Sequence, residues 1–326
     1  MSLYDAVVKV GFRAHEANML PDFIIQAANE QHYELPAEFY QLVLGKHLKY
    51  SCALFNPKSN TLDEAEETML ALYCERACLK DGQTVLDLGF GWGSLSLYIA
   101  KNFPNCKITS VSNSTTQKKL IEDECRKSGF LNVNVIICDI NSFEANAFFD
   151  RIFSIEMFEH MKNYEKLLYK FQPGCTQIAF SLSTSFVTRP LLTTLRKQGI
   201  YVEINSFRTR ICNTSFEPQV SGEDDWLARY FFTGGTMPAD GLILYFQDDV
   251  SILDHWRANG KHYSQTSEEW LKKMDINAKA VKSLFEKTYG TAAGKWWVYW
   301  RTFLLQLQNC LVTMMEKNGW FLIICS

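Results

Sequence analysis

A glycine-rich turn places the strongest constraint on the fold of this chain. In the segment VLDLGFGWGS an apolar run carries Asp87 near its end, and three glycines, Gly89, Gly91 and Gly93, precede a second apolar run. Glycine permits a tight turn and lets a ligand approach bare backbone, and the start of a helix attracts a carboxylate or a phosphate. The segment therefore predicts a strand, a ligand-binding turn and a helix.

Short β-rich runs alternate with helical runs from residue 82 to residue 169. Strands separated by helices at this spacing predict a parallel, doubly wound α/β sheet of the Rossmann-like kind. In such a sheet the ligand site lies at the carboxyl ends of the strands. In chain order the runs are TVLDLGF, SLSLYIAKNF, CKITSVS, a helix over 117–128, VNVIICDI and DRIFSIEMF.

Polar residues at the strand ends indicate which ligand the turn binds. A dinucleotide site needs an acidic residue about twenty residues after the glycines, to hold the ribose. Here the second strand ends in VSNS, without a carboxylate, and Asp139 ends the third strand. With Asp87 and the glycines, this pattern resembles the S-adenosylmethionine (SAM) site of class I methyltransferases. The plainer alternative is that the glycines serve only a tight turn.

Composition and charge exclude several other classes of protein. Lys and Arg number 33 against 36 Asp and Glu, and the net charge of -3 provides no basic field for nucleic acid. The ten cysteines form no CxxC pair and have no zinc-ligand spacing, so we expect no metal, no disulfide framework and a cytoplasmic location. The longest apolar stretch near the carboxyl terminus, Trp320 to Cys325, is too short for an integral membrane span.

Helical sequence precedes the predicted sheet. Thr61 and Glu64 have the spacing of a capping box, in which each residue caps the other's backbone N–H. The helix that follows has an apolar face made by Leu62, Ala65, Met69, Leu72 and Cys74. A second helical stretch, between Pro36 and Pro57, carries Phe39, Leu42, Val43 and Leu48.

Three parts follow from these patterns. We predict a helical cap over residues 1–80, a SAM-binding Rossmann-like domain over 81–221, and a helical aromatic region over 222–326 that ends in a sheet-closing segment. The aromatic region would cover the substrate.

Further motifs give the chain a family resemblance. It resembles the cyclopropane-fatty-acid-synthase-like methyltransferases, and within them most closely the plant coclaurine and related benzylisoquinoline N-methyltransferases. The resemblance covers most of the chain outside 171–221 and 306–326. The matching segments include QHYELPAEFYQLVLGKHLKYS, LDEAEETMLALYCERA, GWGSLSLYIAKNFPNCKITSVSNSTTQ, DRIFSIEMFEHMKNY, DDWLARYFFTGGTMP, GKHYSQTSEEWLKKMD and VYWRTF.

The resemblance implies a class I methyltransferase fold with SAM as methyl donor and a set of residues around it. Tyr50 and Ser51 would close over SAM. The other implied contacts are Gly89, Gly91 and Gly93 at its methionine end, Asn113 and Gln117 near its ribose, and Asp139 and Ile140 at its adenine, and Asp87 is a further cofactor-binding residue.

The FEHM segment carries the candidate catalytic residues. The resemblance implies that Glu156 and His160 act at the amine, whereas Glu159 matches the glutamate that holds bicarbonate in cyclopropane synthases. Glu156 and His160 are four residues apart, so they share a face if the chain turns helical there. A carboxylate and an imidazole can accept the proton of an ammonium group and expose its lone pair. The alternative is an ion pair that only stabilises the helix.

Two aromatic clusters have two interpretations. Tyr230, Phe231 and Phe232 form one cluster, and the segment WWVYW over 296–300 forms the other. They could be walls around a cationic or planar amine, because aromatic faces attract cations. Alternatively, they are simply hydrophobic core.

The chain departs from the family at three places. Phe90 replaces the cysteine of the usual GCGWG motif, and its ring would crowd the floor of the pocket. Over 171–221 and 306–326 the amino-acid sequence is unlike that of the family. Codons can nevertheless be chosen for Gly174–Arg196 and Gln306–Ser326 such that a two-base shift of the reading frame gives a family-like sequence. We hypothesise that both segments are frame-shifted. If the chain has the given amino-acid sequence, we expect its sheet to lack the fifth strand and the last strand.

These observations predict N-methylation of a small amine of the coclaurine or tetrahydroisoquinoline type, by a chain that forms a homodimer or acts alone. One alternative is methylene transfer to lipid acyl chains, and another is an inactive SAM-binding product. The expected partner is a small-molecule amine, and we expect neither a nucleic-acid partner nor integration into a membrane.

Overall fold

A computed structural model of the chain reveals the architecture. The residues that it describes are 35–57, 61–144, 148–161, 164–171, 178–182, 199–204, 226, 230–231, 251–252, 254–315 and 320–325. The statements below concern these residues.

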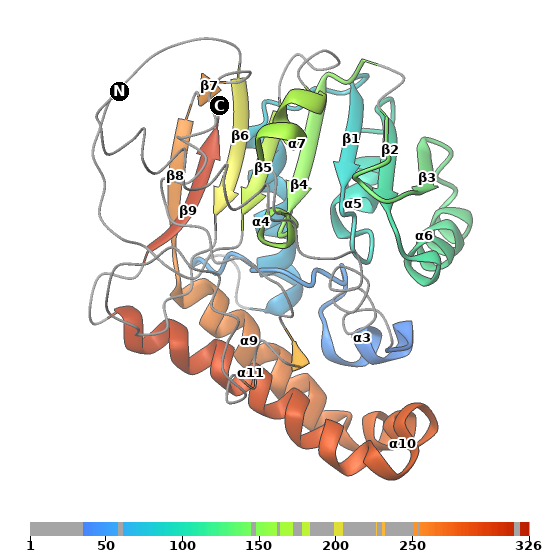
Figure 1. Cartoon of the computed structure of the whole chain (residues 1–326), viewed down its shortest axis with the longest axis vertical. Helices are drawn as coiled ribbons and strands as arrows, with labels where there is room; N and C mark the ends of the chain where they lie inside the picture. The colour runs from blue at the N-terminus through green and yellow to red at the C-terminus, as the bar shows by residue number, and fades with distance from the viewer. Residues whose placement is uncertain are drawn as a thin grey trace.

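Nine strands from the described segments form one sheet, in the order β3-β2-β1-β4-β5-β6-β9-β8 with β7 beside β6 (Figure 1). The strands from β3 to β6 pair in parallel, whereas β9 runs antiparallel to β5, β6 and β8. The bounds are β1 Thr84–Leu88, β2 Lys107–Ser112, β3 Val133–Ile137, β4 Arg151–Ile155, β5 Ile178–Leu182, β6 Gly199–Ile204, β7 Ser251–Ile252, β8 Asp254–Asn259 and β9 Trp320–Cys325.

Helices connect β1 to β2, β2 to β3 and β4 to β5, as parallel pairing of neighbouring strands favours. The helix α5 contacts β2 and β3, and α6 contacts β3. Their bounds, with those of the helices before β1 and after β4, are α4 Leu62–Arg76, α5 Ser94–Asn102, α6 Thr115–Ser128, η1 Phe158–His160 and α7 Tyr164–Phe171.

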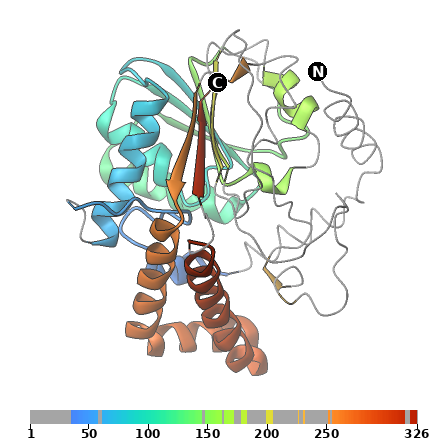
Figure 2. The same cartoon turned by 90° about the vertical axis from the view of Figure 1, so that its left-hand side faces the viewer.

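A second layer of helices lies beyond the carboxyl ends of the parallel strands. Figures 1 and 2 show α3, α9, α10 and α11 at this end of the sheet, where β8 leads directly into α9. The helices α9 and α11 pack along each other. The bounds are α3 Ala37–Val43, α9 Lys261–Ile276, α10 Ala278–Tyr289, η4 Gly290–Ala292 and α11 Ala293–Met315.

One hydrophobic core joins the helical layer to the sheet. Phe39 of α3 lies 4.6 Å from Trp300 of α11 between ring centroids, and Tyr40 lies 4.5 Å from Trp92 in the glycine turn. Burial of several large rings stabilises this junction, because each contributes about 2 to 3 kcal/mol of hydrophobic free energy. The helical layer is therefore fixed against the strand ends where a ligand is expected.

The structure confirms the strands and helices predicted between residues 82 and 169. It also confirms the capping box, in which the Thr61 hydroxyl accepts from the Glu64 N–H and the Glu64 carboxylate accepts from the Thr61 N–H. The prediction that Leu48 belongs to a helix is wrong. The helix α3 ends at Val43, and Leu48 has a φ of 51°, which an α-helix does not allow.

The expectation of a missing fifth strand and a missing last strand is also wrong. The odd segments contain β5 and β9, which pair with their neighbours in the sheet. The remaining residues of 171–221, apart from β6 and Phe171, lie outside the described residues, as do 316–319 and Ser326. The frame-shift hypothesis itself stays a prediction.

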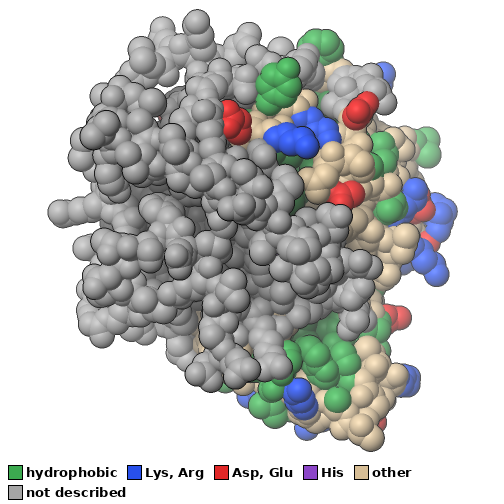
Figure 3. Space-filling model, in the orientation of Figure 1, with side chains coloured by type: hydrophobic (Ala, Val, Ile, Leu, Met, Phe, Trp, Pro, Cys, Tyr) green, Lys and Arg blue, Asp and Glu red, His purple; other side chains and the backbone are tan. Residues whose placement is uncertain are grey.

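No helix among the described residues combines the length and the apolar character needed to cross a membrane. Figure 3 shows charged side chains of both signs along the edge of the molecule where α6 lies. On α6 itself, Arg126 pairs with Asp123 and Lys127 with Glu124.

Candidate active site

The glycine turn connects β1 to α5 and follows the predicted pattern. Gly89, Gly91 and Gly93 have φ values of 74°, 52° and 85°, in the left-handed region that favours glycine. A Cβ on Gly93 would lie 2.6 Å from Ile121, so this glycine allows close packing of α5 on α6. A Cβ on Gly91 would meet no atom within 4 Å. The backbone at Gly91 therefore faces open space, which fits a ligand such as SAM that approaches main chain.

Asp87 lies beneath this turn in the interior. Its Oδ2 accepts a hydrogen bond of 2.5 Å from the Ser96 hydroxyl, which is itself 2.7 Å from the hydroxyl of Ser110. Burial raises the pKa of the Asp87 carboxyl to about 6, and the Ser96 hydrogen bond opposes this shift. The carboxyl group ties β1 to the first turn of α5 and to β2.

The ends of β2 and β3 carry the residues expected near the ribose and the adenine. Gln117 is buried, and its Oε1 accepts from the hydroxyl of Ser112 at 3.1 Å, whereas Asn113 is exposed. Asp139 is exposed, and its Oδ1 accepts from both the backbone and the side-chain amide of Asn141. These bonds fix the turn after β3 at the same edge of the sheet as the glycines.

The backbone after Asp139 is held from a different element. The carbonyl of Ile140 accepts a hydrogen bond of 3.0 Å from the Lys170 ammonium group of α7. The predicted adenine-side residues thus lie on a braced turn.

The loop after α3 brings Tyr50 and Ser51 to this end of the sheet. The Tyr50 ring is half-buried and lies 5.4 Å from the ring of Tyr40 and 5.6 Å from that of Trp270 on α9. The Ser51 hydroxyl is buried and accepts a hydrogen bond from the ammonium group of Lys49. Tyr50 is thus the more accessible of the two residues.

Glu156 lies at the centre of the candidate active site. It follows β4 with a φ of 51°, a strained value for a residue with a side chain. Its Oε1 accepts a hydrogen bond of 3.1 Å from the backbone N–H of Cys52, and its Oε2 accepts one of 3.2 Å from the hydroxyl of Tyr263. Three distant parts of the chain, the loop after α3, the end of β4 and α9, therefore meet at one half-buried carboxylate.

The turn after Glu156 does not place Glu156 and His160 on one face of an α-helix. It is a three-residue 3-10 helix that begins at Phe158, so Glu156 lies outside it and the i, i+4 spacing of an α-helix does not apply. His160 ends this helix, is half-buried, and donates its backbone N–H to the Met157 carbonyl. The side chain of Glu159 lies outside the described residues.

Met157 links the two parts of the site. Its side chain lies about 3.1 Å from the position that a Cβ on Gly89 would take. The turn that carries Glu156 and the glycine turn therefore pack against each other.

Sequence reasoning missed Cys52 and Tyr263 as partners of Glu156. They lie 104 and 107 residues from it, so no local spacing indicates the contact. The segments KYS and HYSQTSEEW, already noted for their resemblance, were the available signal.

The aromatic clusters divide into buried and half-buried rings. Phe231, Trp300 and Phe303 are buried, and Phe231 stacks on Phe303 at 4.4 Å. The outer rings face the protein's own cations, since the Lys295 ammonium lies 5.1 Å from the centroid of Tyr230 and 5.0 Å from that of Tyr299. Phe232 lies outside the described residues.

The inner rings therefore fit the core interpretation, and the outer rings show that their faces accept an ammonium group. Figure 3 shows hydrophobic side chains, with Lys or Arg beside them, gathered at the helical end of the molecule. The ring of Phe90 is likewise buried in the core. No cluster of three or more potential metal ligands occurs within the described part of the chain.

Comparison with known proteins gives the site its chemical context. The sequence profile of mycolic acid cyclopropane synthetase matches residues 25–304. The chain is 42% identical over 288 residues to (S)-coclaurine N-methyltransferase of Thalictrum flavum subsp. glaucum, covering 86% of this chain and 73% of that protein. The chain belongs to the mycolic acid cyclopropane synthetase family.

Two further relatives agree with this assignment. Pavine N-methyltransferase of Thalictrum flavum subsp. glaucum is 40% identical, over 84% of this chain and 71% of that protein. The crystal structure of coclaurine N-methyltransferase bound to N-methylheliamine and SAH superposes with a TM-score of 0.75 and 36% identity, over 98% of this chain and 94% of that one.

These findings confirm the class I SAM-dependent methyltransferase fold, the methyltransferase class and SAM as methyl donor.

Proposed function

We propose that this family member transfers the methyl group of SAM to the nitrogen of a small amine of the benzylisoquinoline type. The observation that carries the proposal is the carboxylate of Glu156, which two donors orient at the junction of the sheet edge and the helical layer. The relatives named coclaurine and pavine N-methyltransferase support this substrate class.

The amine must lose a proton before it can be methylated. At neutral pH an alkylamine is an ammonium ion, whose nitrogen has no lone pair to attack with. The Glu156 carboxylate attracts this cation and accepts its proton, with His160 as a second acceptor at the same turn. The Cys52 N–H and the Tyr263 hydroxyl hold the carboxylate in one orientation, so that little reorganisation precedes the transfer.

The residues at the edge of the sheet are those that would hold SAM. SAM supplies an activated methyl group when bound. Gly89, Gly91 and Gly93 offer bare backbone at a helix start, and Asp87 braces this turn from below. The remaining proposed contacts are Tyr50 and Ser51 over the cofactor, Asn113 and Gln117 near the ribose, and Asp139 and Ile140 near the adenine.

Methylene transfer to lipid acyl chains is the second candidate, because the family profile is that of a cyclopropane synthetase. In this reading Glu159 would hold bicarbonate. A double bond carries no charge, so this substrate does not need a carboxylate to attract it, and the proton lost when the ring closes would pass to the bicarbonate.

One experiment separates the two candidates. The purified chain is incubated with isotopically methyl-labelled SAM and, in parallel, with a panel of tetrahydroisoquinolines and with unsaturated phospholipid vesicles. We expect the isotopic label in an amine product that carries one added methyl group. Label in a cyclopropane ring of the lipid would overturn the proposal. Label in neither, from a chain that binds SAM by calorimetry, would favour the inactive SAM-binding product instead.

A homodimer and a cytoplasmic location stay predictions from the sequence. Sedimentation of the purified chain with and without SAM tests the first. The expected dimer has twice the 37.6 kDa mass of the chain.

A further inference from the structure

Lys49 is a buried cation beside the candidate active site. Its side chain is 1% exposed. The ammonium Nζ donates to the Ser51 hydroxyl and to the Cys52 carbonyl, both at 2.5 Å, and to the Tyr73 hydroxyl at 3.1 Å. An ammonium group has three N–H donors, and these three acceptors match them. Burial of a cation is costly unless its donors are satisfied, so this lysine is held in one place.

The ammonium group fixes the peptide next to Glu156. The carbonyl of Cys52 accepts from Lys49, and the N–H of the same peptide, that of Ala53, donates to the Thr266 hydroxyl of α9 at 3.0 Å. The N–H of Cys52, one peptide earlier, donates to Glu156. The Cys52 N–H that orients Glu156 is therefore held in place through the next peptide, which hydrogen-bonds to Lys49 at its carbonyl and to Thr266 of α9 at its N–H.

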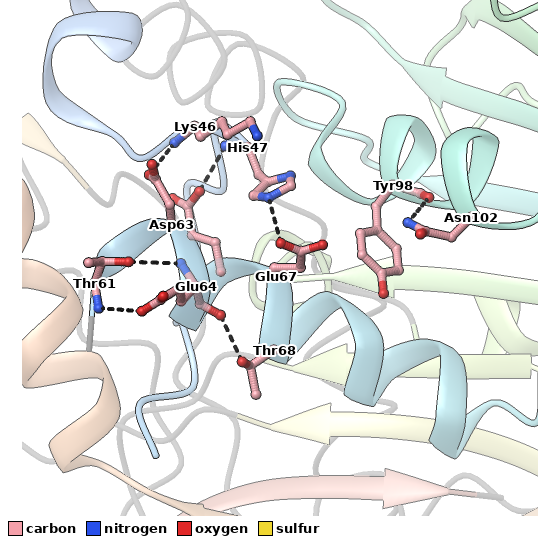
Figure 4. Close-up of polar contacts among 10 residues, drawn as sticks. Lys46, His47, Thr61, Asp63, Glu64, Glu67, Thr68, Tyr98 and Asn102 are labelled. Carbon is pink, nitrogen blue, oxygen red and sulfur yellow. Dashed lines mark hydrogen bonds and ion pairs between the residues drawn. The ribbon is translucent and has the colours of Figure 1, made fainter. Parts of the chain in front are cut away.

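The helix α4 anchors the start of this loop. Glu66 of α4 is 0% exposed, and its two carboxylate oxygens accept from the backbone N–H groups of Gly45 and His47, at 3.1 and 2.9 Å. Figure 4 shows Lys46 and His47 beside Asp63 and Glu67 of the same helix. Tyr73, which accepts from Lys49, lies two turns further along α4. Glu66 therefore holds the start of the loop that follows α3 against α4, and Lys49 links the distal part of the loop to Tyr73 of the same helix.

We propose that Lys49 is a positioning residue of the methyl-transfer reaction, which acts through the Cys52 peptide to orient the Glu156 carboxylate. The role rests on the proposed function, in which Glu156 accepts the proton of the amine. Lys49 itself contacts neither the amine nor the methyl group.

Hydrogen exchange in the chain without SAM tests the structural step. Lys49→Met keeps the length of the side chain and removes its charge and donors. Amide exchange over residues 50–54 is expected to become about tenfold faster, because a charge-assisted hydrogen bond is lost, while exchange in β1 and β4 stays the same. Lys107→Met, at an exposed lysine, is the matched control and is expected to change neither region.

Kinetics test the catalytic step. Lys49→Met is expected to lower kcat about tenfold while KM for SAM changes less than threefold. In a Glu156→Gln background the same substitution is expected to have little further effect, because residues that act through one another are not additive. A rise in KM for SAM with kcat unchanged would overturn the route through Glu156.

The exchange result is independent of the methyl acceptor, so it stands even if no amine is methylated. If Lys49→Met does not fold, Tyr73→Phe keeps the ring and removes one acceptor, with an expected acceleration of about threefold over 50–54. Unchanged exchange over 50–54, or equal acceleration across the whole sheet, would overturn the proposal.

Discussion

Two neighbouring regions of the site are held together in different ways. The glycine turn depends on short-range geometry, namely three positive φ values, a close packing of Gly93 on Ile121 and the buried Asp87 beneath. The carboxylate of Glu156 depends on hydrogen bonds from segments more than a hundred residues away.

Because of this difference, substitutions in the two regions should affect SAM binding and the methyl-transfer step separately. A change in the glycine turn alters packing and backbone conformation, so it should affect stability and SAM binding together. A change around Glu156 alters the orientation of one charged group on an otherwise intact scaffold, so it should affect kcat above all.

Glu156→Gln is expected to have the largest effect. The amide keeps the shape of the side chain but cannot accept a proton, so kcat should fall about 10²- to 10³-fold, since general-base groups contribute about 10²- to 10⁴-fold. Steady-state kinetics and a thermal melt check this, and the melting temperature should stay close to that of the unsubstituted chain.

Glu144→Gln is the matched control at an exposed glutamate. A kcat for Glu156→Gln within threefold of the control would remove Glu156 as the proton acceptor. It would also erase the distinction between the two regions.

Gly93→Ala is expected to destabilise the fold by about 3 kcal/mol. The new Cβ would lie 2.6 Å from Ile121, and an L-residue at a φ of 85° is strained. Gly91→Ala is the paired variant, because its Cβ would meet only open space and only the cost of its φ, about 1 kcal/mol, remains. Chemical denaturation measures both.

The paired glycines also report on SAM. Gly91→Ala should weaken SAM binding in calorimetry more than its small loss of stability suggests, because the new methyl group lies in the space where a ligand would approach. Equal SAM affinity in Gly91→Ala and the unsubstituted chain would place the cofactor elsewhere.

The sequence predicted the first region better than the second for a physical reason. The turn, the four strands from β1 to β4 and the capping box of Thr61 all follow from neighbours within a few residues. The contacts of Glu156 follow from tertiary folding, which residue spacing does not encode. The same limit explains the wrong prediction for Leu48, which lies beyond the end of α3 at Val43 and has a positive φ. The FEHM segment forms a 3-10 helix, which residue spacing alone does not distinguish from an α-helix.

The strands β5 and β9 show a related limit of prediction from family likeness. The amino-acid sequence over 171–221 and 306–326 is unlike that of the family, and we therefore expected strands to be missing there. The strands β5 and β9 nevertheless form in these segments. Short apolar runs such as IAFSL and WFLIIC satisfy the pattern of a buried strand without any family likeness.

Glu66 makes stability depend on pH. Burial raises the pKa of its carboxyl group to about 7, against an ordinary value near 4.5, while the N–H groups of His47 and Gly45 oppose the shift. Between these values the unfolded chain releases the proton more readily than the folded chain does. The contribution to the free energy of unfolding is therefore greatest below pH 4.5 and falls as the pH rises to 7, by about 2 to 3 kcal/mol.

Glu66→Gln removes this titration. The difference in unfolding free energy between the unsubstituted chain and the variant should slope between pH 4.5 and 7 and be level above pH 7. Thr68→Ala, which removes no titratable group from the same helix, should give a level difference throughout. A level difference for Glu66→Gln as well would mean that Glu66 stays ionised in the folded chain.

Thr61→Ala should have only a small effect on the free energy of unfolding, and it tests how α4 supports the loop at Glu156. It removes the hydroxyl that accepts from the Glu64 N–H at the start of α4, so stability should fall by about 1 kcal/mol. Because α4 also carries Glu66 and Tyr73, a frayed first turn tests whether the loop at Glu156 depends on the whole helix or on those two side chains. Thr68→Ala makes the same chemical change inside the helix and should cost nothing measurable, since alanine is the better helix former. We expect kcat to stay within twofold in both variants, whereas a selective loss of kcat in Thr61→Ala would show that the end of the helix, and not the buried side chains, orients the carboxylate.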